Sequence, residues 1–357
     1  VVQHINYPSP IDIDTFVTDS TGTLMLPEAL GFGNYELYEQ QSPWGYVLDD
    51  EPVPFVVDGT QDVVTVTKYN TVQKGTITVH KEGEVFSHVA EAGGLYQPQY
   101  EVQGQPGAVY DIIALEDIVT PDGVVHAKAG ELVATLTTGS DGTATSEPLY
   151  LGRYQVSERT APAGMVLDPE PKEATLAYAG QEVSVTTAEV GFVNERQKVE
   201  ISLKKLLEQD ETFSIGMNGE WKNITFGLFA AEEIVAADGS SIPADGLIET
   251  IGIDENGNAA FKTDLPCGAS LYVKEIGTDE HYLLSDEKYP VVVEYAGQDV
   301  ATVQLEVNDG EAIENTLKYG KVSGWKVDQD GFELGGAVIG LFRFDETEFT
   351  KETALMV

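Results

Sequence analysis

The sequence predicts an all-β protein in which β-sandwich domains follow one another end to end as a rod. Short segments such as residues 63–67, 76–79 and 134–137 alternate apolar or β-branched residues with polar ones, and this period of two is typical of strands. Turn dipeptides, for example Asp122-Gly123, separate these segments. Short strands with frequent turns favour a sandwich or a barrel.

An internal repeat of about 120 residues sets the domain organisation. A strand-like segment that carries a glutamate occurs three times, and successive glutamates are 119 and 117 residues apart. Each repeat ends on an asparagine, and a lysine follows that asparagine after 11 residues in all three cases. The repeated residues are Glu39, Glu158 and Glu275; Asn70, Asn194 and Asn315; and Lys81, Lys205 and Lys326.

These landmarks divide the chain into four units. Unit one (1–73) is the back part of a truncated β-sandwich repeat, units two (74–197) and three (198–318) are complete repeats, and unit four (319–357) is the front part of a truncated repeat. Only a few residues join successive units, so we expect a semi-rigid rod. Unit two carries extra residues at about 82–105, which we interpret as an inserted loop.

Charge and composition exclude several classes of function. The 357 residues include 60 acidic and 20 basic side chains, and the net charge of −40 argues against nucleic-acid partners. No run approaches the ~20 apolar residues of a membrane span, so no membrane insertion is expected in this segment. Cys267 is the single cysteine and the five histidines are scattered, so we expect no internal disulfide, metal site or cofactor. Neither end has the features of a natural terminus, and we expect the chain to be part of a longer protein.

The repeated lysine, glutamate and asparagine predict a reaction inside each complete unit. The lysine and the glutamate share the period of the apolar residues in their strands, so we expect both to face the core. Desolvation lowers the pKa of a lysine and raises that of a carboxylic acid. A neutral amine is a nucleophile, so the lysine is expected to attack the asparagine side chain, release ammonia and form an amide bond with assistance from the glutamate. Because this happens once per domain, we do not expect an enzyme with turnover.

The same residues give the chain a resemblance to a known family. The strand ending at Lys81, residues 152–164 (Gly-Arg-Tyr-Gln-Val-Ser-Glu-Arg-Thr-Ala-Pro-Ala-Gly) and the closing Phe192-Val193-Asn194 resemble the collagen-adhesin B-type, prealbumin-like (SpaA-type) repeat domains of Gram-positive cell-wall surface proteins and pilins. The resemblance covers nearly the whole chain. It implies reverse-immunoglobulin β-sandwiches with self-formed Lys–Asn isopeptide bonds, on the outside of a bacterial cell and anchored to its wall in the full-length protein.

Carried over by position, the resemblance implies one bond-forming set in each complete unit, with the glutamate assisting: Lys81, Glu158 and Asn194 in unit two, and Lys205, Glu275 and Asn315 in unit three. In unit three, Asn308 is an alternative acceptor to Asn315. Glu39 and Asn70 have no lysine upstream, and Lys326 has no glutamate or asparagine downstream. Their bonds require the longer protein, or a neighbouring chain whose residues 319–357 complete residues 1–72.

We therefore expect a structural stalk or adhesin segment whose partners are neighbouring domains of the same longer chain. Two alternatives remain open. One is a ligand-binding adhesin module that recognises a host matrix protein or glycan. The insertion at 82–105 is the only segment whose sequence supports this alternative. The other is an accessory β-module of a cell-surface carbohydrate-active enzyme.

Overall fold

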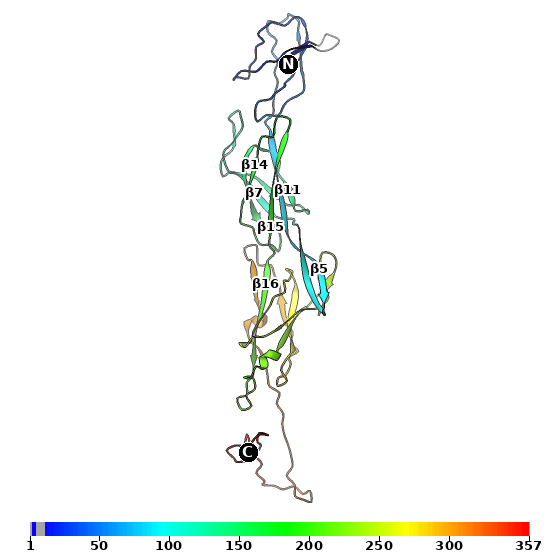
Figure 1. The fold of residues 1–357 in the computed structure, drawn as a ribbon, viewed down its shortest axis with the longest axis vertical. Coiled ribbons are helices and arrows are strands. Elements are labelled where there is room, and N and C mark those ends of the chain that lie inside the picture. The colour runs from blue at the N-terminus through cyan, green and yellow to red at the C-terminus, as the bar shows by residue number, and fades with distance from the viewer. Residues whose placement is uncertain (1, 5–10, 357) are drawn as a thin grey trace.

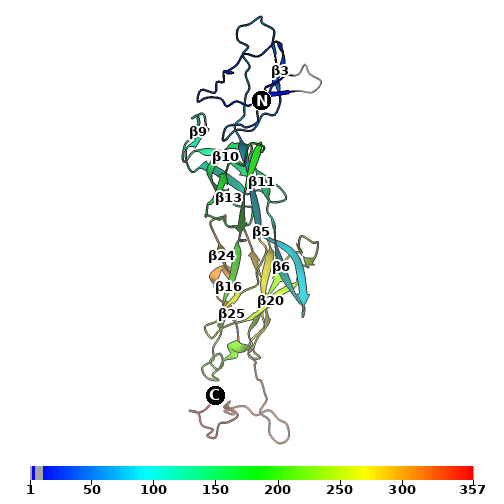
Figure 2. The same ribbon diagram turned by 45° about the horizontal axis from the view of Figure 1, so that its top comes forward.

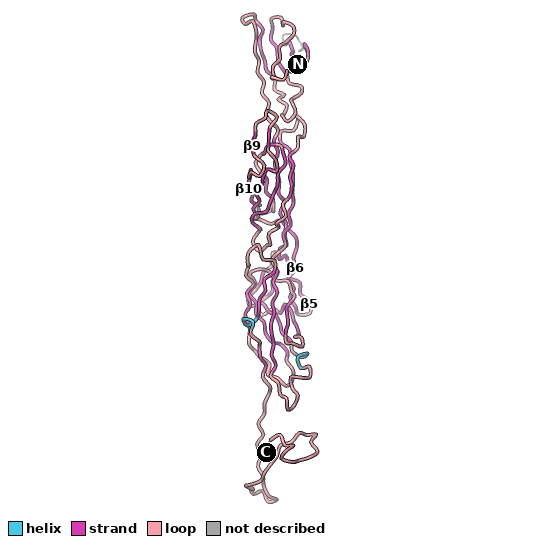
Figure 3. The backbone as a smooth tube through the Cα atoms, turned by 90° about the vertical axis from the view of Figure 1, so that its left-hand side faces the viewer, coloured by secondary structure: helices cyan, strands magenta, loops and turns pink. Residues whose placement is uncertain are grey.

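The computed structural model describes residues 2–4 and 11–356, and strands make up nearly all of its regular structure, which confirms the all-β prediction. Helices among these residues are limited to two 3-10 turns, η1 (Glu220–Asn223) and η2 (Val307–Gly310). Units one, two and three follow one another along the long axis (Figure 1), and the view turned by 90° shows the same elongated shape (Figure 3).

Unit two is a sandwich of two sheets. One sheet has the order β10-β7-β13-β14, and the other is centred on β5, which pairs with β11, β12 and β15. Ile77, Val79, Tyr110, Val156 and Phe192 are fully buried between the sheets. The strands are β5 (Lys74–Ala92), β6 (Leu95–Gly104), β7 (Val109–Ala114), β8 (Ile118–Val119), β9 (Val125–Ala127), β10 (Leu132–Thr137), β11 (Thr143–Thr145), β12 (Leu149–Tyr150), β13 (Gly152–Thr160), β14 (Lys172–Leu176) and β15 (Val185–Asn194).

The first and the last strand of unit two are parallel neighbours. β5 pairs with β15 in an unbroken register that ends with Asn194 opposite Gly83. A short turn cannot join parallel neighbours, so the rest of the unit separates them along the chain. From its start to Lys81, β5 alternates partly exposed and buried residues, and Lys81 falls on the buried side with Ile77 and Val79.

Unit three repeats this arrangement. One sheet has the order β20-β17-β22-β23, and the other is centred on β16, which pairs with β21 and, in parallel, with β24 and β25. Leu203, Phe226, Leu228, Val273 and Ile313 belong to its buried core. The strands are β16 (Lys198–Leu207), β17 (Thr225–Ala230), β18 (Ile234–Val235), β19 (Ser241–Ile242), β20 (Leu247–Gly252), β21 (Asn258–Phe261), β22 (Ser270–Gly277), β23 (Tyr289–Val292), β24 (Thr302–Glu306) and β25 (Ile313–Asn315).

Unit one has a single described sheet, at the N-terminal end of the rod (Figure 2). Its order is β2-β1-β3-β4, with β1 (Val2–His4), β2 (Ile11–Asp14), β3 (Gly33–Leu37) and β4 (Val53–Val57). The predicted strand at 63–67 is wrong, because these residues form no ladder. They still alternate exposed and half-buried positions as β15 does. The corresponding strands of units two and three pair with an opening strand, and unit one has no such strand among its described residues.

Unit four has no sandwich within residues 319–356. Isolated bridges, such as the one between Val327 and Glu333, are the only pairings described in this segment, and the chain runs away from the end of the rod (Figure 1). Apolar side chains including Val322, Trp325 and Phe344 are consequently exposed.

The insertion in unit two is a long β-hairpin of β5 and β6, so its interpretation as a loop is wrong. The hairpin lies against unit three (Figure 2). Ala237 N of unit three donates to Phe86 O at 3.0 Å, and Val89 N donates to Ser240 Oγ at 2.9 Å. Val89 and Tyr96 pack on the core of unit three. The hairpin therefore fastens two units together.

A buried arginine adds further contacts between the hairpin and unit three. The Arg196 guanidinium lies 3.7 Å from the centroid of the Tyr100 ring on the hairpin. Its Nη1 donates to Leu265 O of unit three at 3.1 Å, and its Nη2 pairs with Asp264. Stacking on an aromatic face combined with directional hydrogen bonds suits the planar guanidinium.

The junctions between units are built alike, beginning with a linker glutamine. Each glutamine is the last residue of its unit, and its backbone N bonds within that unit: Gln73 N donates to Gly45 O at 2.8 Å, and Gln197 N donates to Gly164 O at 2.9 Å. Both side chains are buried and bind a loop of the following unit. Each donates twice and accepts once: Gln73 with Gly180 O, Val183 O and Ala179 N, and Gln197 with Gly297 O, Val300 O and Ala296 N.

A second glutamine in each of those loops reaches back to the preceding unit. Gln181 Oε1 accepts from Ser42 N at 2.9 Å, and Gln298 Oε1 accepts from Ala161 N at 2.9 Å. Buried polar groups that are fully hydrogen-bonded hold one geometry, because breaking any bond leaves an unsatisfied group. The two junctions are therefore expected to be stiff.

We predict that Gln197→Ala loosens the junction between units two and three. The change removes three buried hydrogen bonds, at a cost of roughly 1–3 kcal/mol for each group left unsatisfied. Small-angle scattering should show a more flexible particle than the parent, and protease cleavage near residue 197 should be faster. Gln304→Ala, on the exposed edge of unit three, is the matched control. Scattering identical to that of the parent would contradict the role given to Gln197.

Candidate functional site

The structure brings together Lys81, Glu158 and Asn194, which we call the unit-two cluster. Lys81 is on β5 and Asn194 ends the neighbouring β15, while Glu158 comes from β13 in the facing sheet. Lys81 lies opposite Phe192 in the parallel ladder, which places it two residues before the position of the asparagine. Three strands from two sheets thus meet at one point of the core.

Within the unit-two cluster, the glutamate lies between the other two side chains. Lys81 Nζ is 3.8 Å from Glu158 Oε1, and neither side chain is exposed to solvent. Asn194 Nδ2 donates to Glu158 Oε2 at 2.7 Å, and Asp168 N donates to the same oxygen at 2.9 Å. Lys81 Nζ also donates to Glu82 O at 3.1 Å. Asn194 Oδ1 is buried and has no hydrogen-bond partner within the described residues.

The structure also brings together Lys205, Glu275 and Asn315, the unit-three cluster. Lys205 Nζ donates to Asn315 Oδ1 at 2.6 Å and lies 3.6 Å from Glu275 Oε1. Asn315 Nδ2 donates to that same Glu275 oxygen at 2.7 Å. Lys205 is opposite Ile313 in the parallel ladder of β16 and β25, so the lysine again precedes the asparagine by two positions. Asn308 lies elsewhere, in η2, and its Nδ2 donates to Glu311 O at 3.3 Å.

Burial changes the acid–base state of both lysines. Desolvation lowers the pKa of Lys81 to about 8, although the charge of Glu158 opposes part of the effect. The pKa of Lys205 is lowered by the same cause and is opposed by Glu275. Each amine is therefore closer to its neutral, nucleophilic form at neutral pH than an exposed lysine is.

Two hydroxyl groups at these sites were not foreseen from the sequence. Tyr110 lies opposite Glu158 and donates to Glu158 Oε1 at 3.2 Å, and burial raises the pKa of this tyrosine, which keeps its proton in place for donation. Thr278 Oγ1 accepts from Asn315 Nδ2 at 2.9 Å. Tyr110 is one of several inward-facing strand residues and Thr278 directly follows the end of β22, so no sequence pattern marked either of them.

The remaining repeated residues form half-sites. In unit one, Asn70 Nδ2 donates to Glu39 Oε2 at 2.6 Å, and Asp49 N donates to the same oxygen at 3.0 Å, which repeats the arrangement around Glu158. Both side chains are half-buried rather than buried. Lys326 in unit four is exposed and its Nζ donates to Val327 O at 3.0 Å.

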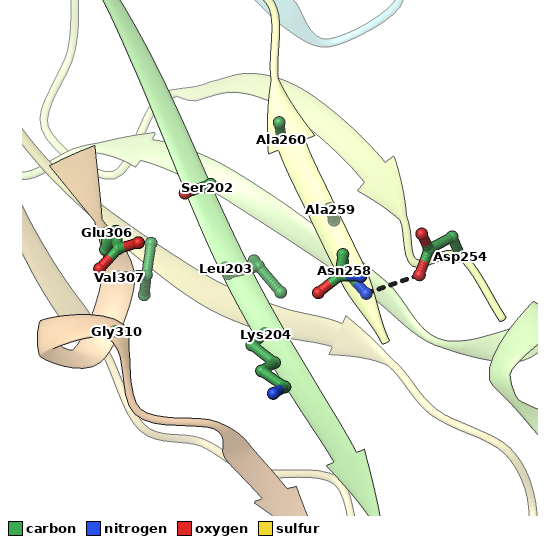
Figure 4. A pocket seen from close by; sticks show the side chains of 10 residues that line it. All are labelled: Ser202, Leu203, Lys204, Asp254, Asn258, Ala259, Ala260, Glu306, Val307 and Gly310. Atoms are coloured by element: carbon green, nitrogen blue, oxygen red, sulfur yellow. Dashed lines mark hydrogen bonds between the residues drawn. The ribbon is translucent and has the colours of Figure 1, made fainter. Parts of the chain in front are cut away.

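A surface depression of about 460 Å³ lies beside β16 in unit three (Figure 4). Its lining includes Ser202, Lys204, Asn258 and Glu306, and Asn258 N donates to Asp254 Oδ1 at 2.7 Å. No member of the unit-three cluster lines it. Across residues 2–4 and 11–356, no group of three or more His, Cys, Asp or Glu side chains is placed to hold a metal ion, and no helix is both long and apolar enough to cross a membrane.

Comparison with known proteins identifies the fold. The family described as SpaA, prealbumin-like fold domain, matches residues 4–87 and 103–190, and the unmatched residues between these segments belong to the β5–β6 hairpin. No curated protein matches the chain.

The chain is also similar to solved structures, to different degrees. The Bacillus anthracis TIE protein is similar at 20% identity over 88% of this chain and 47% of its own, with a TM-score of 0.52. This chain thus spans about half the length of that protein. The shaft pilin SpaA from Lactobacillus rhamnosus GG matches at 12% identity over 70% of this chain and 100% of its own, with a TM-score of 0.23. GBS52, the minor pilin of Streptococcus agalactiae, matches at 14% identity over 70% and 99%, with a TM-score of 0.22.

The likeness to TIE shows the fold, and the family match covers the segments that carry Glu39, Lys81 and Glu158. Residues 4–87 and 103–190 belong to the family of SpaA-type prealbumin-like domains, which follow one another in tandem.

Proposed function

We propose that this chain is a stalk segment of a bacterial cell-surface protein in which units two and three each seal themselves with a Lys–Asn amide bond. The observation that carries the proposal is the pair of buried clusters, which combine the same three residue types in the same strand register in two separate units. An extracellular location and a stalk role are supported by the family, since relatives of this fold include shaft and minor pilins.

The proposed reaction balances without a cofactor. The neutral Nζ attacks Cγ of the asparagine, a C–N bond forms, and the bond from Cγ to Nδ2 breaks. One proton leaves Nζ and one ammonia molecule departs, so the products are a secondary amide and ammonia. The glutamate contacts both nitrogens and can carry the proton from the attacking nitrogen to the leaving one. Exclusion of water keeps the amine neutral and the reactants aligned.

The resulting bond stabilises the unit in two ways. The link between Lys81 and Asn194 closes a loop of 113 residues, which in a chain-entropy account contributes roughly 4–5 kcal/mol. It also ties β5 directly to its parallel neighbour β15, so a pulling force passes from the first strand to the last strand. In a chain with one cysteine, the amide bonds take the place of disulfides.

The half-sites complete the proposal. Glu39 and Asn70 are arranged as in the full clusters, and we propose that they receive a lysine from an opening strand of the longer protein or from residues 319–357 of another chain. A concentrated solution that remains monomeric on a sizing column, without covalent dimers on a denaturing gel, would exclude the second source.

The ligand-binding alternative rested on the insertion of unit two. Its hairpin uses Val89, Tyr96 and Tyr100 to contact unit three. These contacts favour an inter-domain role over capture of a host protein or glycan.

We predict that the purified chain is lighter than its sequence mass by two ammonia molecules, one for each complete unit. Intact-mass spectrometry of Lys81→Ala and of Lys205→Ala should each show one loss, and the double variant none. Lys204→Ala is the matched control, because Lys204 precedes Lys205 and is exposed, and it should still show two losses. A parent protein with its full sequence mass would refute the proposal.

We also predict that the rate of bond formation in unit two depends on pH. The amine must be neutral, and the pKa of Lys81 is lowered to about 8, so the rate should rise about tenfold per pH unit below pH 8 and level off above it. The measurement is the loss of ammonia over time from freshly synthesised protein that is quenched in acid at intervals. A plateau that begins only near 10.5, the ordinary lysine value, would show that burial does not control the reaction.

A further inference from the structure

The corner that follows each repeated glutamate has the same geometry in all three units. A backbone hydrogen bond closes it in every case, Tyr46 N to Pro43 O, Met165 N to Pro162 O and Tyr282 N to Asp279 O. The residue just before each corner therefore occupies one equivalent position, which is three residues after the glutamate. Ser42, Ala161 and Thr278 occupy it.

In unit three the residue at this position, Thr278, accepts a hydrogen bond from the side-chain amide of Asn315. Asn315 Nδ2 donates to Glu275 Oε1 and to Thr278 Oγ1, while Asn315 Oδ1 accepts from Lys205 Nζ. Both N–H groups and the carbonyl oxygen of the amide are thus engaged. The lysine and the amide meet at a single oxygen of Glu275.

Unit two holds its amide differently. Ala161 offers no hydroxyl group, and Tyr110 donates instead to Glu158 Oε1, the oxygen nearer Lys81. Asn194 is held by the other oxygen of Glu158, and its own carbonyl oxygen has no partner in the described chain.

The residue opposite the glutamate also differs between units two and three. Phe226 lies opposite Glu275 as Tyr110 lies opposite Glu158, so unit three has no hydroxyl group at this point. Units two and three therefore each have one hydroxyl group at the cluster. In unit three it is hydrogen-bonded to the asparagine amide, and in unit two to the glutamate carboxylate.

We propose that Thr278 is a positioning residue that directs the Asn315 amide toward Lys205, and that unit three consequently forms its bond faster than unit two. This inference rests on the proposed function. With Nδ2 held by Thr278 and Glu275, Cγ is presented to the amine, and one carboxylate oxygen can carry the proton from Nζ to the departing ammonia. In unit two the two nitrogens contact different oxygens, so a side chain must turn before the reaction, and misalignment of this kind slows a reaction between held groups.

The test compares Thr278→Val, which keeps the shape but removes the hydroxyl, with Thr278→Ser, which keeps the hydroxyl. Ammonia loss is followed over time in freshly synthesised chain, and peptide mapping assigns it to unit two or unit three. We expect Thr278→Val to slow formation of the unit-three bond about tenfold, the effect of losing one hydrogen bond, and Thr278→Ser to react at close to the parent rate. The rate of bond formation in unit two serves as an internal control in the same molecule and should not change. The pH at which the unit-three rate levels off should also stay the same, since the lysine itself is unaltered.

A reciprocal variant keeps the proposal testable if Thr278→Val fails to fold. Tyr110→Phe gives unit two the residue of unit three and frees the oxygen near Lys81, so its bond should form several-fold faster. Equal rates in Thr278→Val and the parent, or a unit two that is faster than unit three in the parent, would overturn the proposal. Absence of ammonia loss from both units of the parent would instead refute the amide bonds themselves, and the two failures are therefore distinguishable.

Discussion

A lysine nitrogen held in a dry core beside a side-chain amide and a carboxyl group is the interaction on which the rest of this structure depends. An isolated charge at such a place would be costly, because the interior cannot solvate it. The sandwich offers two remedies that act in opposite directions: the nearby glutamate stabilises the charged lysine, whereas desolvation lowers the lysine pKa toward the neutral amine and is the larger effect. The parallel pairing of first and last strand then decides which two parts of the chain meet. The packing of the core and the proposed reactivity of the lysine therefore depend on the same burial.

The junctions impose a second constraint. At each junction one buried glutamine uses both amide hydrogens and its oxygen, and a second glutamine accepts from the backbone of the preceding unit, so a change of angle between units would leave several polar groups unpaired. The hairpin of unit two adds a further contact that only the second junction has. At the end of unit three, Lys318 stands where Gln73 and Gln197 stand in the earlier units, and its Nζ bonds to Glu280 O within unit three. This difference coincides with the point where the chain leaves the rod (Figure 1).

Alternating residues and turn dipeptides in the sequence were enough to predict the fold class, and the repeat spacing was enough to predict the residues of each cluster. The three equal intervals from asparagine to lysine and the similar intervals between successive glutamates reflect equivalent positions in repeated sandwiches, and such positions can be recognised even when local patterns are ambiguous. The strand predicted at 63–67 failed because a strand needs a neighbour, which the local pattern does not reveal. The hairpin was missed because its Gly- and Gln-containing composition resembles a loop, whereas contacts with unit three stabilise it. Tyr110 and Thr278 form hydrogen bonds with residues far away in the sequence, and a single sequence carries no information on which hydroxyl group meets a given carboxylate or amide.

The parallel pairing of first and last strands also determines how far this molecule can lengthen. With both amide bonds formed, the backbone between Lys81 and Asn194 and between Lys205 and Asn315 lies outside the line of tension. Only the 11 residues from Asn194 to Lys205 remain in series between the two sites, and fully extended they span about 36–40 Å. Much of this stretch already runs as β16, so little slack is left. If the proposed amide bonds form, the rod should therefore behave over these two units as a nearly inextensible tether, which keeps its reach under load instead of absorbing the load by unravelling.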